Sequence, residues 1–364
     1  MPFLATLGAG SIGAYRNFKR GGLPPPYNYV AQVFGPNTTG TAYGGSTVNS
    51  LVELNPAVPS ATARLSGIVA DRNFIVVSGI YYSLDNGLSW NLSGADFGQF
   101  TDTSMPPGLN GSVAYNPTAR RFFGHYTISD GGMLHLVYSI NSSGVTTYAG
   151  VAGSASNAQV YNMIYSPALD RAFLWGFGSS LSNVLSIDGT TGSTGSVRSA
   201  SSPGNYRAGI SHDGYPLGAK YNGFGTSFNL YKYTTESLTS WTDLGGISDS
   251  YGSFPYNCQS PIHWFPINGR YYSIGAQQVG NVFVLRRSTN SGDPGYFNYA
   301  AQVTISGASS ITKINLMEDE NGVIWIFGSA DNGNFMYYSN NGGTVITQAS
   351  PVYSSISRNF NPIP

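Results

Sequence analysis

The sequence predicts an all-β protein that is rich in tight turns. Its 364 residues include 47 Gly and 20 Pro, and these two residue types cost about 1 and 3 kcal/mol in the interior of a helix. Much of the remaining chain consists of short β-branched or aromatic runs, separated by Asn-Gly, Asp-Gly and Ser-Gly pairs that favour turns between strands. With 41% hydrophobic residues, the chain can also build a substantial core.

The charge content excludes several classes of partner. Only 9% of the residues are charged, against about 25% in an average soluble domain. The 17 basic and 17 acidic residues balance, so the basic excess of a protein that binds nucleic acid or anionic lipid is missing. A lone cysteine, Cys258, excludes an intrachain disulfide and a cysteine-based zinc site. No apolar run approaches the ~20 residues of a membrane span.

Composition divides the chain into four segments. Residues 1–22 mix small and apolar residues before turning basic, as expected of an N-terminal anchor or assembly segment. Residues 23–59 begin with a leucine and three consecutive prolines and are expected to form an extended linker and the first strands. Residues 60–350 are uniform, and residues 351–364 are expected to form an extended tail or a closing strand. The expected anchor residues are Phe3, Leu4, Leu7, Ile12 and Arg16.

A unit of about 50 residues repeats along residues 60–350, as propeller blades do. The clearest copy has an apolar strand within residues 72–79, a second strand from Tyr81 and an aromatic stop at Trp90. Further copies start near residues 120, 171, 213, 270 and 322. Blades of antiparallel strands around an axis leave only short sheet edges. The sequence therefore predicts a β-propeller, with six blades as the favoured number and a large β-sandwich or a β-helix as the alternatives.

One turn of the repeat carries a specific motif. The run Ser-Leu-Asp-Asn-Gly-Leu-Ser-Trp at residues 83–90 resembles the Asp-box, or BNR repeat, of sialidase-like six-bladed propellers. In such a turn the Asp85 carboxylate accepts backbone N–H groups, Gly87 takes a positive φ and Trp90 packs beneath the hairpin. The resemblance implies a structural turn, formed with Ser83, that lies away from the active face. Degraded copies with Asn in place of Asp occur at residues 288–292 and 339–343.

The chemistry that the resemblance implies is not matched elsewhere in the chain. Sialidases need three arginines that hold a carboxylate, a Tyr nucleophile activated by Glu, and an Asp acid. The chain has few Glu residues, and we find no counterpart of the N-terminal Arg-Ile-Pro signature. The four histidines show no metal-ligand spacing. We therefore predict no catalytic residue, no metal ligand and no cofactor, and a sialidase-like glycoside hydrolase stays an alternative only.

The candidate ligand-binding residues are aromatic. Tyr256, His263 and Trp264 lie between two of the expected blades, where exposed loops of a propeller would sit. Aromatic rings with hydroxyl and amide neighbours stack on sugar rings or pack against protein partners. Packing in the core is the alternative role for each of them.

The overall character of the chain resembles bacteriophage virion proteins such as tail fibres, tail tips and capsid decorations. It combines little charge, abundant Gly, Ser, Thr, Asn and Tyr, and a start without the basic region of a signal peptide. The resemblance implies a non-enzymatic structural protein, made in the host cytoplasm and located in the virion. Its N-terminal segment would bind other virion proteins, and its propeller would be displayed to bind host-surface glycan. A free carbohydrate-binding lectin is a further alternative.

Overall fold

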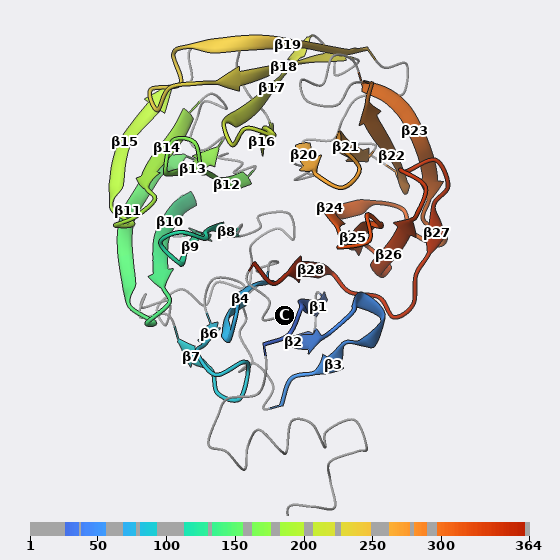
Figure 1. The fold of residues 1–364 in the computed structure, drawn as a ribbon, viewed down its shortest axis with the longest axis horizontal. Helices are drawn as coiled ribbons and strands as arrows, with labels where there is room; N and C mark the ends of the chain where they lie inside the picture. The colour runs from blue at the N-terminus through green and yellow to red at the C-terminus, as the bar shows by residue number, and fades with distance from the viewer. Residues whose placement is uncertain are drawn as a thin grey trace, which may run out of the picture.

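The computed structural model is a β-propeller of seven four-stranded antiparallel sheets, arranged around a central axis (Figure 1). The structure describes residues 26–35, 38–55, 68–77, 81–92, 113–129, 133–155, 162–175, 183–199, 207–222, 227–248, 262–276, 280–289 and 297–360. The expected anchor residues and Tyr256 lie outside these ranges. Within them, no helix has the length and apolar character needed to cross a membrane.

Six blades, named B to G, are continuous in sequence, and in each the first strand lies nearest the axis. Blades B, C and D contain β4 (Ile68–Asp71), β5 (Phe74–Val77), β6 (Tyr81–Ser83), β7 (Asn91–Leu92); β8 (Val113–Asn116), β9 (Arg121–Ser129), β10 (Met133–Asn141), β11 (Thr146–Ala155); and β12 (Asn162–Ser166), β13 (Arg171–Trp175), β14 (Asn183–Asp188), β15 (Thr194–Ser199). Blades E, F and G contain β16 (Arg207–Ile210), β17 (Pro216–Asn222), β18 (Ser227–Tyr233), β19 (Trp241–Ser248); β20 (Ile262–Phe265), β21 (Arg270–Ala276), β22 (Val282–Ser288), β23 (Phe297–Thr304); and β24 (Ile311–Glu318), β25 (Ile324–Ala330), β26 (Gly333–Ser339), β27 (Thr347–Gln348).

The remaining blade, A, closes the ring with strands from distant parts of the chain. Its outer strands are β1 (Tyr29–Gly35), β2 (Thr38–Gly45) and β3 (Val52–Glu53), with a short 3-10 helix, η2 (Val48–Ser50), between the last two. Its innermost strand is β28 (Ser355–Arg358), which pairs antiparallel with β1 and lies beside it near the centre of Figure 1.

Blade A corrects the predicted blade number from six to seven. The six repeat starts in the sequence correspond to the second strands of blades B to G, which are buried and therefore read as apolar runs. The second strand of blade A is β1, and its first strand is made more than 300 residues later in the sequence. No contiguous repeat therefore marks this blade.

The core is divided among the interfaces between blades, and each of the seven interfaces holds its own cluster of buried apolar side chains. Strand β5 shows how one strand supplies two clusters. Phe74 and Val76 pack towards blade C, whereas Ile75 and Val77 pack towards blade A. Because successive side chains of a strand point to opposite faces, a strand covered on both faces is apolar throughout.

Candidate functional site

The two described residues of the predicted ligand face lie on β20, the first strand of blade F, and serve different interfaces. Trp264 packs between blades E and F, where its ring centroid is 4.9 Å from that of Tyr271 and 5.6 Å from that of His212. This is the packing role that the sequence left open. His263 instead contacts blade G through a polar partner, Asn315.

His263 and Asn315 form a polar pair on the innermost strands of blades F and G. The imidazole Nε2 lies 3.0 Å from the Oδ1 of Asn315, and that same oxygen accepts the backbone N–H of Leu316 at 2.8 Å. Because an amide oxygen can only accept, Nε2 carries the hydrogen in this contact, and Nδ1 of the neutral ring keeps its lone pair. Asn315 was not selected from the sequence, since it lies 52 residues away on another blade.

The surroundings of His263 keep its ring neutral. Burial lowers the pKa of His263 to about 4, although the hydrogen bond that its ring donates to Asn315 opposes this effect in part. At neutral pH the side chain is therefore an uncharged imidazole whose Nε2–H is held by Asn315 and whose Nδ1 carries a lone pair. Such a group can take a proton from a reacting water, which is the task of a general base.

A ring of polar contacts joins the blades on one face of the propeller. This face, here named the turn face, is formed by the turns that link first to second and third to fourth strands within each blade. Each of the seven interfaces has a contact there. The pairs are Asn359 with the backbone of Arg72, Arg120 with Asp71, Asn116 with Asp170, Ser166 with Gly214, His212 with Tyr271, Asn268 with Glu318, and Glu320 with Tyr29.

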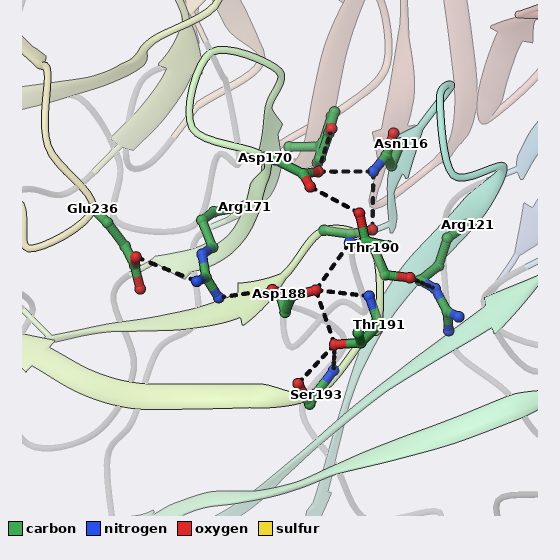
Figure 2. Close-up of polar contacts among 11 residues, drawn as sticks. Asn116, Arg121, Asp170, Arg171, Asp188, Thr190, Thr191, Ser193 and Glu236 are labelled. Carbon is green, nitrogen blue, oxygen red and sulfur yellow. Dashed lines mark hydrogen bonds and ion pairs between the residues drawn. The ribbon is translucent and has the colours of Figure 1, made fainter.

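Figure 2 shows part of the ring where blades C, D and E meet. Asn116 is fully buried and donates from Nδ2 to Asp170 at 3.0 Å and to the carbonyl oxygen of Gly189 at 2.9 Å. Arg171 lies between two carboxylates, with Asp188 at 3.4 Å and Glu236 at 3.3 Å.

The carboxylates of this network are held by the protein itself. Hydrogen bonds from Thr191 and Thr190, together with the Arg171 charge, outweigh desolvation and lower the pKa of the Asp188 carboxyl. Asp170 accepts hydrogen bonds from Asn116, from the Tyr165 hydroxyl and from Thr190. Because these groups satisfy one another, the network joins blades and offers little to a ligand.

The motif at residues 83–90 forms a self-contained turn between β6 and β7. Ser83 Oγ donates to Asp85 Oδ1 at 2.7 Å and accepts the N–H of Gly87, whose φ is 86°. Burial raises the pKa of Asp85, but hydrogen bonds from Ser89 and Ser83 outweigh it, so the net pKa is lowered. Trp90 packs against the cluster between blades A and B. The carboxylate is thus bound within its own turn.

The degraded copy at residues 339–343 has the same hydrogen-bonding pattern. Ser339 Oγ donates to Asn341 Oδ1 at 2.8 Å and accepts the N–H of Gly343 at 3.0 Å. Asn341 Oδ1 also accepts the N–H of Val345 at 2.9 Å. An amide oxygen therefore replaces the carboxylate in this turn without changing its form.

A cavity of about 640 Å³ opens between blades G and A on the turn face. Its walls come from the β24–β25 turn, from the end of β26, and from the start of β1 together with η2. No sequence pattern marks this cavity, because its walls come from segments that are nearly 300 residues apart in the chain. Among all the described residues, the cavity included, no group of three or more His, Cys, Asp or Glu side chains is placed to hold a metal ion.

The fold is shared with solved structures of other proteins. No family model matches the chain, and no curated protein matches its sequence. The periplasmic gluconolactonase of Pseudomonas aeruginosa matches with a TM-score of 0.57 and 11% identity, over 92% of this chain and 99% of that one. A Bacteroides fragilis protein provisionally named a 6-phosphogluconolactonase matches with a TM-score of 0.56 and 10% identity, over 90% of this chain and 96% of that one. At such identity the likeness establishes the propeller fold alone.

These neighbours correct the functional expectation. The chain was predicted to be a non-enzymatic structural protein of a phage particle. Two solved structures that share its fold carry the names of enzymes, a gluconolactonase and a provisional 6-phosphogluconolactonase, and on this finding the prediction of a non-enzymatic virion protein is wrong. The Asp-box resemblance extends to the propeller fold and not to a sialidase identity. The virion location, the virion-protein partners and the host-surface glycan stay predictions.

Proposed function

We propose that the protein hydrolyses a sugar-derived lactone, with His263 as the base that activates water. The observation that carries the proposal is the neutral, oriented imidazole of His263 on the first strand of blade F, bonded to Asn315 at 3.0 Å. The names of the two fold neighbours, a gluconolactonase and a provisional 6-phosphogluconolactonase, suggest the substrate class.

The reaction needs one base and one returned proton. Nδ1 of His263 takes a proton from water as the water oxygen bonds to the lactone carbonyl carbon. The ring C–O bond then breaks, and the imidazolium returns the proton to the departing ring oxygen, which leaves an open-chain hydroxy acid. Asn315 is a positioning residue, because its Oδ1 accepts the Nε2–H and thereby fixes the tautomer.

The lowered pKa of His263 predicts how kcat/KM depends on pH. A base is active when unprotonated, so activity is lost as the pH falls through its pKa. An ordinary histidine would lose activity near pH 6.5, whereas His263 would do so near pH 4, where its pKa lies. After subtraction of spontaneous hydrolysis, we expect kcat/KM to be flat between about pH 5 and 7 and to fall only below that range.

The test is acid release from glucono-δ-lactone and from its 6-phosphate, followed by pH-stat with the full chain. We expect His263→Ala to lower kcat/KM by about 10²- to 10⁴-fold and Asn315→Ala to shift the acid limb of the pH profile. His212→Ala is the matched control, since His212 is exposed and bonds to Tyr271 on another interface. A wild-type rate no faster than buffer on both lactones would overturn the proposal, as would full activity in folded His263→Ala.

A further inference from the structure

We propose that the cavity between blades G and A is a second binding site, separate from His263, and that it takes a neutral sugar ring. Its volume of about 640 Å³ falls within the range of about 300–1,000 Å³ that small-molecule sites occupy. The residues that line it are Tyr29, Thr47, Val48, Asn49, Asp319, Glu320, Asn321, Val323, Trp325, Tyr338, Asn340, Gln348, Ala349 and Ser350. None of them belongs to the machinery proposed for lactone hydrolysis.

The inner wall of the cavity is held rigidly. The Asp319 carboxylate, on a residue only 7% exposed, accepts the backbone N–H groups of Asn321 and Val323 at 2.9 Å each. Its second oxygen accepts the indole N–H of Trp325, also at 2.9 Å. This buried carboxylate is therefore committed to shaping the wall and has little capacity left for a ligand.

Aromatic rings form an apolar surface within the cavity. The Trp325 and Tyr338 rings lie with their centroids 5.5 Å apart. Trp325 is 4% exposed and Tyr29 is 1% exposed, so these two rings support the wall and the half-buried Tyr338 ring is the aromatic surface that faces a ligand. Aromatic side chains combine a large apolar face with a polar edge. The carbon-bound hydrogens on one face of a pyranose can pack on such a surface, while the hydroxyl groups of the sugar point outwards.

The rim carries groups that match those hydroxyls. The side chains of Asn49, Asn321, Asn340 and Gln348 are exposed, and in the described part of the chain none of them has a hydrogen-bond partner. Each amide offers both donors and acceptors, as a sugar hydroxyl requires. Four unpaired amides around one cavity differ from the self-satisfied polar groups of the C–D interface.

The charge of the lining selects against anions. Its charged members are Asp319 and Glu320, both acidic, and no Lys or Arg lines the cavity. A phosphorylated or carboxylated ligand would be repelled. The exposed Glu320 carboxylate can instead accept hydrogen bonds from two neighbouring hydroxyl groups of an uncharged sugar.

The experiment is a titration of the full chain with D-glucose, D-galactose and D-mannose, followed by tryptophan fluorescence and isothermal calorimetry. We expect saturable binding of at least one of these sugars, and binding of its 6-phosphate at least about tenfold weaker. Tyr338→Ala should weaken binding about tenfold through loss of the ring, and Asn340→Ala, on the exposed rim, should weaken it without affecting folding. Tyr299→Ala is the control, since Tyr299 is 53% exposed on β23 and outside the cavity.

The outcomes separate the two sites. Binding that persists in His263→Ala would support a separate site, whatever the lactonase assay shows. Absence of binding by all three sugars would overturn the inference. Tighter binding of the sugar 6-phosphate would also overturn it, as would equal affinity in wild type, Tyr338→Ala and Asn340→Ala.

Discussion

The interface between blades C and D and the interface between blades G and A use equivalent strands and turns, but hydrogen bonds close the first and a cavity opens in the second. Both bury an apolar cluster, and in both a turn of one blade faces the third-to-fourth strand connection of the next. At the C–D interface that connection reaches Asn116 through Gly189 (Figure 2). At the G–A interface the corresponding residues line a cavity. Polar density alone therefore does not mark a site, whereas unpaired polar groups around a cavity do.

The difference follows from how each connection satisfies its own polar groups. In blade A the connection folds into η2, where Thr47 and Ser50 bond to each other in a capping box. These groups are used locally and do not cross the interface. In blade D the backbone of the connection remains available, so Gly189 and Thr190 accept hydrogen bonds from Asn116 and Arg121 of blade C. A short 3-10 helix thus leaves room for a ligand.

The largest expected effect is at the C–D interface. Asn116→Ala removes a fully buried side chain that donates twice and also accepts the N–H groups of Thr118 and Ala119. We expect a loss of about 2–3 kcal/mol in the free energy of unfolding, because buried partners are left unpaired. Urea denaturation followed by circular dichroism measures it. A loss below about 0.5 kcal/mol would show that the network contributes nothing to blade association.

An intermediate effect is expected at the wall of the G–A cavity. Trp325→Phe keeps an aromatic ring but removes the indole N–H that Asp319 accepts at 2.9 Å. We expect a loss of about 1–2 kcal/mol, since a buried carboxylate loses one of three donors. The same urea denaturation tests it. If the variant were as stable as wild type, Asp319 would not depend on the indole, and the wall would be less rigid than we infer.

The smallest effect is expected on the cavity rim. Asn340→Ala is the same chemical change as Asn116→Ala, but Asn340 is exposed and its side chain has no partner in the described part of the chain. We expect the free energy of unfolding to change by no more than about 0.5 kcal/mol while sugar affinity falls. The pair of variants gives a direct contrast in thermal denaturation. Equal destabilisation by both would remove the distinction between the two interfaces.

The features that the sequence predicted are those whose signal is local. The second strands of blades B to G are buried on both faces, so their apolar runs repeat and indicate a propeller. The turn at Ser83 is likewise visible, because its hydrogen bonds join residues within a few positions of one another. Blade A was missed because β28 and β1 are far apart in the chain.

The candidate site was only partly predictable, for the same reason. His263 was selected as a ligand-face residue, but its partner Asn315 and its neutral state depend on how blades F and G pack. The G–A cavity needs Tyr29 and Trp325 side by side, and only closure of the ring brings them together. A pattern of apolar and turn residues carries no information about which blade becomes the neighbour of the first.

The two paired strands β1 and β28 are made at very different times during synthesis. The ribosome makes β1 before any other strand described here and β28 after all of them, so a nascent chain holds an open sheet edge at β1 until the propeller is nearly complete. Such edges recruit other strands, and folding during synthesis must protect this one. The G–A cavity forms only when blade G, the last of the contiguous blades to be made, packs against the start of β1 and η2. A ligand bound there would therefore distinguish finished molecules from truncated ones.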